Sequence, residues 1–172
     1  MKESDLNKLL TNPNLVQEKI NNFLKNKILK KQSIDKDEIH GHTLKSDHNL
    51  RFISGNITLG FLDWAIVGCY YACYHAALSL ILTKGYSSKN HLATLNVLIK
   101  EFYKKGLDKD DLELISNFLD YQDVLFYVES KNKREDAAYS TKIKFEKNEA
   151  EQLRIKAVMF VSKIKSMIEN LY

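Results

Sequence analysis

The feature that most constrains the fold is an uncharged stretch of 20 residues from Trp64 to Thr83. A helix of this length and composition is long enough to cross a bilayer. However, tyrosines, a histidine and other polar side chains lie within the stretch, and a single lipid-facing helix would have to bury them at a cost. The central helix of a soluble bundle places the same groups against partner helices. We therefore predict a core helix and no membrane partner.

The scarcity of turn-forming residues favours helices over sheets. The chain of 172 residues contains six glycines and one proline, and tight hairpin turns depend on such residues. No segment shows a sustained alternation of apolar and polar residues, which is the pattern of a half-buried strand. A chain of this length buries one core. We predict an all-α fold, an up-and-down antiparallel helical bundle, with extra N-terminal helices.

Capping residues and apolar spacing predict where the helices begin and end. The first helix must end before Pro13, because proline disfavours helical geometry in the residue before it. The helix that contains the uncharged stretch runs from Leu62 to Lys84 and ends at Gly85, in the position typical of a C-terminal glycine. The predicted N-terminal caps are Asn14, Ser33 or Asp35, Ser87 or Ser88, Asp108 and Asn148.

The last helix and the N-terminal region each carry a regular pattern. From residue 150 onward, apolar residues alternate by three and four, which indicates a bundle seam or a dimer face. Residues 1–35 form a predicted N-terminal helical extension to a bundle of residues 36–172. The extension holds five lysines with no acid between them, and these form either a solvated helix face or a surface that contacts phosphate or a partner. These lysines are Lys19, Lys25, Lys27, Lys30 and Lys31.

Charge and cysteine content limit the possible environments. A net charge of +4 permits phosphate-rich partners without requiring them. Cys69 and Cys73 lie four residues apart in the apolar helix, which suits buried packing in a reducing compartment. The N-terminal residues show no apolar stretch followed by a small-residue cleavage site, so no secretory signal is visible and we expect a cytoplasmic protein. The sequence contains no recognised zinc spacing, glycine-rich phosphate loop or dinucleotide motif, and we expect neither a metal nor a cofactor.

Candidate site residues lie at one helix end and in one long loop. Residues 131–147 are polar and lack an apolar period, and loops of this length in compact domains are often functional. His75 faces a partner helix or a cleft, as an interior histidine or as a catalyst. Lys89 and His91 stand where a helix begins, with free backbone N–H groups that suit phosphate. Helix capping explains the neighbouring serines equally well.

Three separated motifs give the chain a family resemblance. Residues 70–77 read YYACYHAA, Lys84 and Gly85 follow, and residues 133–139 read KREDAAY. In this order they resemble the YYAxxHAA branch of the HEPN domain family, over about residues 36–171. The resemblance implies a helical bundle, commonly a homodimer, often found beside a minimal nucleotidyltransferase as a toxin–antitoxin pair.

Many HEPN relatives are metal-independent ribonucleases that use an arginine followed four to six residues later by a histidine. By position Arg134 matches the arginine, and its guanidinium would hold the phosphate of RNA or of a nucleotide, with Lys133 beside it. The histidine itself has no match here, and the candidates that follow Arg134 are Tyr139, Ser140 and Thr141. A tyrosine with a pKa near 10 exchanges protons poorly at neutral pH. His75 is therefore a further candidate for the proton transfer.

Two hypotheses follow from these residues. The first is a HEPN-type RNA-binding or nucleotide-binding protein, a toxin–antitoxin component with ribonuclease ancestry, whose catalytic activity stays open. The second is a non-catalytic helical module that docks a nucleotidyltransferase or another partner. Arg134 would bind phosphate under the first hypothesis, and it could equally pair with Asp123 or Glu129 as a structural residue.

Overall fold

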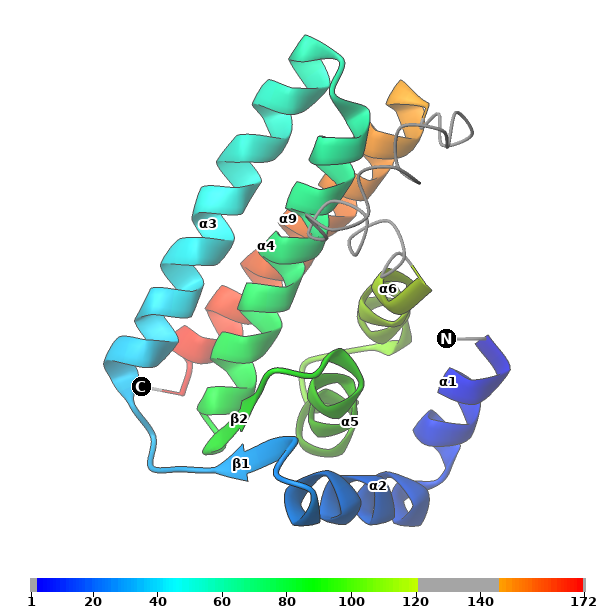
Figure 1. Cartoon of the computed structure of the whole chain (residues 1–172), viewed down its shortest axis with the longest axis vertical. Helices are drawn as coiled ribbons and strands as arrows, with labels where there is room; N and C mark the ends of the chain where they lie inside the picture. Colours follow the sequence, from blue (N-terminus) through cyan, green and yellow to red (C-terminus); the bar gives the residue numbers. More distant parts are fainter. Residues whose placement is uncertain (1–2, 121–145, 172) are drawn as a thin grey trace, which may run out of the picture.

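The computed structural model describes residues 3–120 and 146–171, which form a helical bundle with one small sheet (Figure 1). The predicted all-α fold is confirmed. In chain order the elements are α1 (Glu3–Thr11), α2 (Pro13–Lys25), β1 (Leu29–Lys31), α3 (Lys36–Leu59), α4 (Leu62–Leu82), β2 (Tyr86–Ser88), α5 (His91–Phe102), α6 (Lys109–Asp120) and α9 (Lys147–Glu169).

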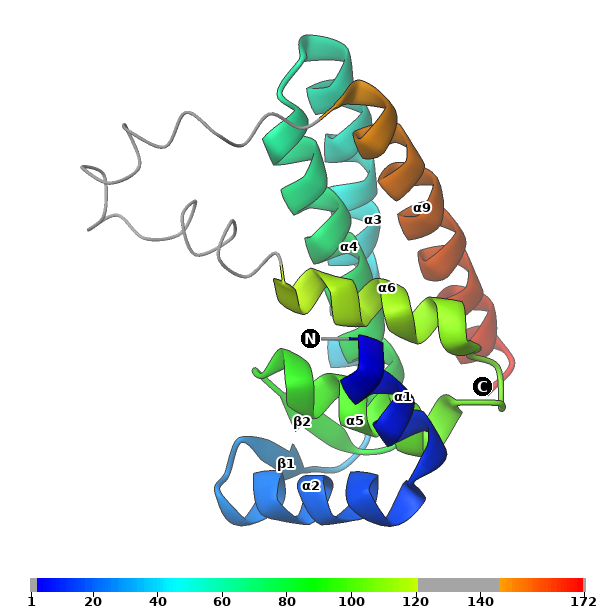
Figure 2. The same cartoon turned by 90° about the vertical axis from the view of Figure 1, so that its right-hand side faces the viewer.

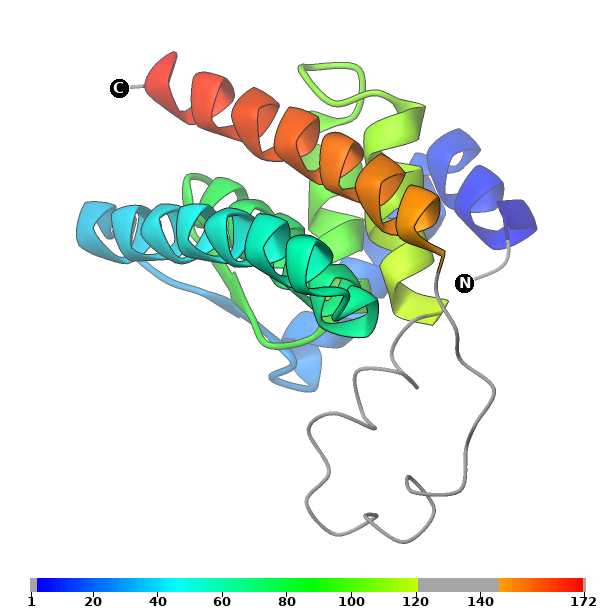
Figure 3. The same ribbon diagram turned by 90° about the horizontal axis from the view of Figure 1, so that it is seen from above.

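Three long helices form one half of the molecule. α3 and α4 make an antiparallel hairpin, and α9 packs along both of them, antiparallel to α3 (Figures 1 and 3). The apolar seam predicted on the last helix faces this interior, because Ala150, Ala157, Phe160 and Ile164 are buried. The seam therefore packs inside the bundle and does not form a dimer face.

α4 is the central helix of the core. Of the helices that the structure describes, it is the one long and apolar enough to cross a membrane, and 83% of its apolar window is buried inside the molecule. A buried helix of this composition is typical of the core of a soluble protein. The prediction of a core helix is confirmed.

The N-terminal helices cover the other half of the molecule. α1 and α2 pack on α5, and α6 crosses between α5 and the long helices (Figure 2). Leu6, Leu9, Val16 and Ile20 are buried in the same hydrophobic cluster as the residues of α4. Residues 1–35 therefore add to one continuous core.

The structure corrects three predicted caps. Asn12 caps α2 by accepting a hydrogen bond from the backbone N–H of Leu15, because Pro13 occupies the first helical position, where no N–H is needed. Asn90 caps α5, since Ser87 and Ser88 belong to a strand. Glu146 rather than Asn148 precedes α9.

Other predicted ends agree with the structure. Asp35 caps α3 by accepting from the N–H groups of Asp37 and Glu38. The Asp108 carboxylate accepts from the N–H of Asp111 at the start of α6. α4 ends at Leu82, and Gly85 follows with a φ of +68°. A side chain on Gly85 would meet the carbonyl of Gln32, so the glycine permits this close approach.

A short sheet was absent from the prediction. β1 and β2 pair antiparallel, with Leu29 opposite Ser88 and Lys31 opposite Tyr86. Each strand has three residues, which is too short for a period-two pattern to be recognised. The pairing joins the N-terminal extension to the connection between α4 and α5.

Candidate functional site

Helix α4 gathers a cluster of rings from four helices. Its residues at positions 70, 71, 74 and 75 lie on one side of the helix, because residues four apart stack above one another. Their rings contact His42 of α3, His91 of α5 and Phe118 of α6. We call this set the ring cluster: His42, Tyr70, Tyr71, Tyr74, His75, His91 and Phe118.

Two histidines form a direct contact between α3 and α4. The Nδ1 atoms of His42 and His75 lie 2.9 Å apart, and their ring centroids are 5.1 Å apart. One imidazole must donate at Nδ1 and the other must accept, so the two rings are in different tautomers. Protonation of both Nδ1 atoms would place two donors face to face. The pair can therefore hold one shared proton at this position, and not two.

Burial keeps the imidazoles of the ring cluster neutral at pH 7. It lowers the pKa of His42 and of His91 below the usual value of 6.5. It lowers the pKa of His75 further, to about 4, because His42 and Lys45 add unfavourable positive charge nearby. A neutral imidazole can accept a proton from a substrate, although one with so low a pKa is a weak base.

The opposite end of the ring cluster is closed. The Tyr70 hydroxyl lies 2.6 Å from Nε2 of His91, and the Tyr74 and His91 ring centroids are 4.1 Å apart. The cavity between these rings, Ile115 and Phe118 has a volume of about 10 Å³. This is room for one water at most. The space between these rings is therefore too small for a substrate, although His91 itself is only partly buried.

Tyr74 lies at the centre of the ring cluster. Its ring centroid is 6.3 Å from that of His75 and 4.1 Å from that of His91, so it touches both predicted histidines. Its hydroxyl oxygen is buried. Burial raises the pKa of this phenol, and the nearby Thr94 side chain partly offsets that rise.

The predicted site residues are only partly brought together. His75 and His91 join the ring cluster, whereas Lys89 is exposed and precedes the cap of α5. The Asn90 side chain already accepts a hydrogen bond from the backbone N–H of Ala93. One of the N–H groups expected to bind phosphate at the start of α5 is therefore already used.

The other predicted site residues, Lys133, Arg134 and Tyr139, lie outside the described residues. They belong to the segment that follows Asp120 directly in the chain, and Phe118 of the ring cluster stands two residues before that point.

Sequence reasoning missed His42 as a member of the site. It is half buried and faces His75. A signal was present, because His42 lies three residues after Ile39 and four before Ser46, both buried on the inner side of α3. The Ser46 hydroxyl donates to the carbonyl of Ala72 on the facing helix.

The cysteines are packing residues, as predicted. Cys69 and Cys73 are free and buried. Burial raises the pKa of Cys69 to about 12 and that of Cys73 well above its usual value, so both remain thiols rather than thiolates. Within residues 3–120 and 146–171, no group of three or more metal-binding side chains gathers.

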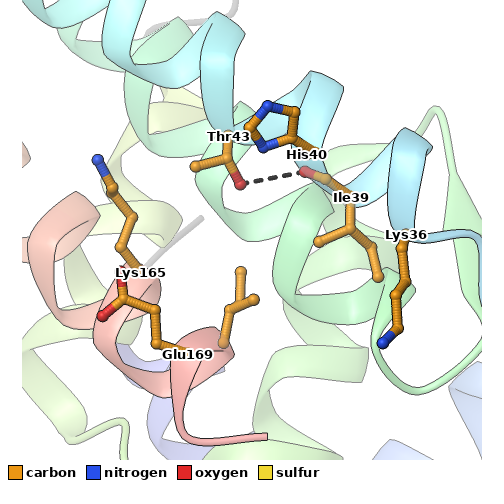
Figure 4. Close-up of a pocket in the computed structure, with 7 residues that line it drawn as sticks. Lys36, Ile39, His40, Thr43, Lys165 and Glu169 are labelled. Atoms are coloured by element: carbon orange, nitrogen blue, oxygen red, sulfur yellow. Dashed lines mark hydrogen bonds between the residues drawn. The ribbon is translucent and has the colours of Figure 1, made fainter. Parts of the chain in front are cut away.

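Two larger cavities are not lined by the histidines of the ring cluster. One of about 270 Å³ lies between the start of α3 and the end of α9 (Figure 4). It is lined by Lys36, His40, Lys165 and Glu169 among others, and Lys165 is held by Asp47 at 2.9 Å. The charges around it are therefore mixed and partly paired.

The other cavity, of about 750 Å³, lies between α6 and α9. Phe118, Leu153 and Phe160 contribute apolar lining, and carboxylates outnumber lysines around it. This acidic groove would repel phosphate. The charged residues that line it are Asp110, Asp111, Glu113, Glu149, Lys156 and Lys163.

The low pKa of His75 predicts a loss of stability in acid. The pKa is 6.5 for an unperturbed histidine and about 4 in the folded protein, so the unfolded chain binds more protons between these values. Stability from this group is fully present above pH 6.5 and declines as the pH falls toward 4. This pKa shift corresponds to a loss of roughly 3 kcal/mol at most in the free energy of unfolding. Because the ring is half exposed, solvent screening reduces the expected loss to about 1.5 kcal/mol.

Urea unfolding at pH 7 and at pH 4.5 measures this loss. The variant His75→Gln removes the titrating group, so its stability should fall less between the two pH values than that of the wild type. His48 is exposed on the same hairpin, and His48→Gln provides the control, which should behave like the wild type. Equal acid sensitivity in all three proteins would show that the histidine pair is not the cause.

Comparison with known proteins places the chain beside one family. A model of the HEPN domain matches residues 42–167. A protein of Methanocaldococcus jannaschii whose name describes it as a candidate toxin is 32% identical over 108 residues. That alignment covers 63% of this chain and 66% of the relative, just under two thirds of the relative's length. The family match begins within α3 and leaves out α1, α2 and β1.

Proposed function

The chain belongs to the HEPN domain family, and from that premise we propose that it is a toxin-type protein that binds and cleaves RNA. The name of the M. jannaschii relative supports the toxin type. The ring cluster is the observation that carries the proposal, because it joins neutral histidines from three helices. We further propose a cytoplasmic location, which agrees with the buried cysteines.

The proposed reaction uses an imidazole and a cation. A neutral imidazole, for which His75 is our candidate, accepts the proton of a ribose 2′-hydroxyl. The 2′-oxygen then bonds to phosphorus as the bond between phosphorus and the 5′-oxygen breaks, and the 5′-oxygen takes a proton from water. The products are a 2′,3′-cyclic phosphate and a 5′-hydroxyl, and the imidazolium returns its proton to solvent. Arg134 is our candidate to hold the phosphate oxygens in a bidentate contact, with Tyr139 and Lys133 beside it. The negative phosphate would also raise the pKa of the imidazole toward neutrality.

We propose a homodimer as the working form. The seam of α9 is used inside the bundle, but the same helix exposes Ile155, Val158 and Met159 to solvent, and Met159 is 67% exposed. Apolar side chains of this size at neighbouring positions on one helix suit contact with a second protein surface.

A cleavage assay with purified protein tests the proposed function. Labelled single-stranded RNA is incubated with the protein at low salt in EDTA, and the products are examined for a cyclic phosphate end. Arg134→Ala is expected to reduce cleavage at least about tenfold, because it removes a charge-assisted contact to the phosphate. His75→Gln should reduce cleavage as well, while His48→Gln and Lys131→Ala serve as matched controls. Cleavage that survives both test variants unchanged, or no affinity for RNA at low salt, contradicts the proposal.

A second candidate function is a non-catalytic module that docks a partner. The turn between α3 and α4 supports it, because Leu59, Phe61 and Trp64 are 72%, 53% and 42% exposed. Under this alternative the partner is a minimal nucleotidyltransferase, as the family resemblance implies. Co-purification from the native host separates the two functions. A docking module would give a stable complex that Trp64→Ser weakens, without any turnover of RNA.

A further inference from the structure

Two segments within the described part of the chain are rich in lysines and poor in acids. From Lys19 to Lys31 there are five lysines and no acid. From Lys84 to Lys105 there are five more lysines and one acid, Glu101. The net charge of the whole chain is only +4. The remainder of the chain is therefore acidic on balance, and the positive charge is unevenly distributed.

The fold brings these two segments side by side. β1 of the first segment pairs with β2 of the second, and α2 packs against α5. Figures 1 and 2 show α2, the sheet and α5 together at one end of the molecule. The positive charge of both segments therefore accumulates at this end, away from the acidic groove between α6 and α9.

Side-chain contacts hold several of these lysines close together. The ammonium group of Lys31 lies 3.3 Å from the centre of the Tyr86 ring, and that of Lys100 lies 3.1 Å from the Tyr86 hydroxyl. Lys31 also donates to the backbone carbonyl of Lys84. The ammonium groups of Lys31 and Lys100 thus gather around one buried tyrosine, and the backbone of Lys84 lies next to Lys31. Lys100 has one acidic neighbour, Glu101, at 3.4 Å.

We propose that this end of the molecule binds the phosphate backbone of a single-stranded RNA. The binding surface, which we call the lysine face, consists of Lys25, Lys27, Lys30, Lys31, Lys84 and Lys100. Most of it is built by residues that precede the HEPN match, so it is an addition to the family domain. The inference rests on the proposed function in one respect, which is the choice of RNA as the nucleic acid that is bound.

The chemistry of the lysine face suits an extended polyanion. Neither of the larger cavities is lined by its residues, so a small enclosed ligand is not favoured. Ammonium groups act as point charges that contact successive phosphates without fixed geometry. Tyr86 is buried beneath the lysines and offers no face on which a base could stack. Binding is therefore expected to depend strongly on salt and little on sequence.

An acidic lipid surface is the competing partner. The exposed apolar side chains at this end are Ile28 and Ile34. Two side chains add little buried area to a membrane contact, which usually needs a larger apolar face beside the cations. The observations therefore favour a nucleic acid strand over a bilayer. Binding to lipid vesicles is measured as part of the test.

The test measures fluorescence anisotropy of labelled oligouridylate and of oligothymidylate of equal length. The triple variant Lys25→Gln, Lys30→Gln and Lys84→Gln should bind both strands about tenfold more weakly at low salt. Its slope of log affinity against log salt should be shallower by about two. The control triple variant Lys45→Gln, Lys147→Gln and Lys156→Gln removes the same charge from exposed positions elsewhere. It should bind nearly as the wild type does.

The outcomes separate this inference from the proposed function. Equal weakening by both triple variants, or no weakening by the first, would overturn the lysine face. Binding to vesicles of phosphatidylserine and phosphatidylcholine, with no affinity for either strand, would also overturn it. Face-dependent binding of oligothymidylate without any RNA cleavage would support the lysine face while the ribonuclease proposal fails. Cleavage and binding that need Arg134 but not the lysine face would support the ribonuclease proposal and overturn the lysine face.

Discussion

The substitution Phe160→Ala is expected to lower the free energy of unfolding by about 3–5 kcal/mol. Phe160 lies on α9, is 1% exposed and belongs to the hydrophobic core on the side that faces α6. Removal of its ring takes away buried apolar area and leaves a cavity that the surrounding helices fill only in part. Because the whole domain is stabilised by roughly 5–15 kcal/mol, this one change removes a large fraction of its stability.

The neighbouring residue supplies a matched control for this prediction. Met159 precedes Phe160 in the same helix and is 67% exposed. Met159→Ala should change the free energy of unfolding of the monomer by less than about 0.5 kcal/mol, as expected of an exposed position, so both variants are compared at protein concentrations too low for the proposed dimer to form. Urea unfolding followed by circular dichroism measures both variants. A similar small effect for Phe160→Ala would show that α9 is not an integral part of the core.

The sequence was sufficient to predict the elements whose signals are local. The uncharged stretch around α4 identified the core helix, because a helix surrounded by other helices is apolar on every side. Asp35 and Asp108 were found as caps, because a side chain that accepts from the first backbone N–H groups needs only its own helix. The three-four alternation on α9 likewise reported burial against neighbours, although it could not distinguish an internal seam from a dimer face.

Features that depend on contacts distant in sequence were not predicted. The pair formed by His42 and His75 joins residues 33 positions apart, and its geometry depends on how α3 and α4 are aligned in the hairpin. The same alignment sets the burial that lowers the pKa of His75. Asn12 and Asn14 flank Pro13, and both are good caps. Only the structure shows that proline takes the first helical position.

The candidate site was predicted in part. His75 and His91 were identified from the residues, and the structure adds that both touch Tyr74. Lys133, Arg134 and Tyr139 stay predictions, because they lie outside the described residues. The lysine run of the N-terminal extension was recognised in the sequence, but its partner segment after α4 was not. Strand pairing and the packing of α2 on α5 are needed to combine the two.

Substitution of Gly68 by alanine is expected to destabilise the protein by about 1–3 kcal/mol. Gly68 lies in α4 and faces α3. A Cβ atom at this position would lie 2.8 Å from Cγ1 of Ile53 and 3.2 Å from Cδ1 of Phe52. Ile53 is fully buried and cannot move away easily. The helices must therefore separate, and this cost exceeds the gain in helix propensity that alanine usually brings.

Gly55 provides a control, because the same substitution there is expected to raise the stability of the protein. It lies in α3, is exposed, and would place a Cβ atom in open space. Gly55→Ala should therefore stabilise the protein by about 0.5–1 kcal/mol, since alanine loses less backbone entropy in a helix.

A double-mutant cycle with Ile53→Ala tests the mechanism. In that background the crowded Cγ1 atom is absent, so Gly68→Ala should cost little or become stabilising. An unchanged cost for Gly68→Ala in the Ile53→Ala protein would show that close packing of the hairpin is not the reason glycine is needed at position 68.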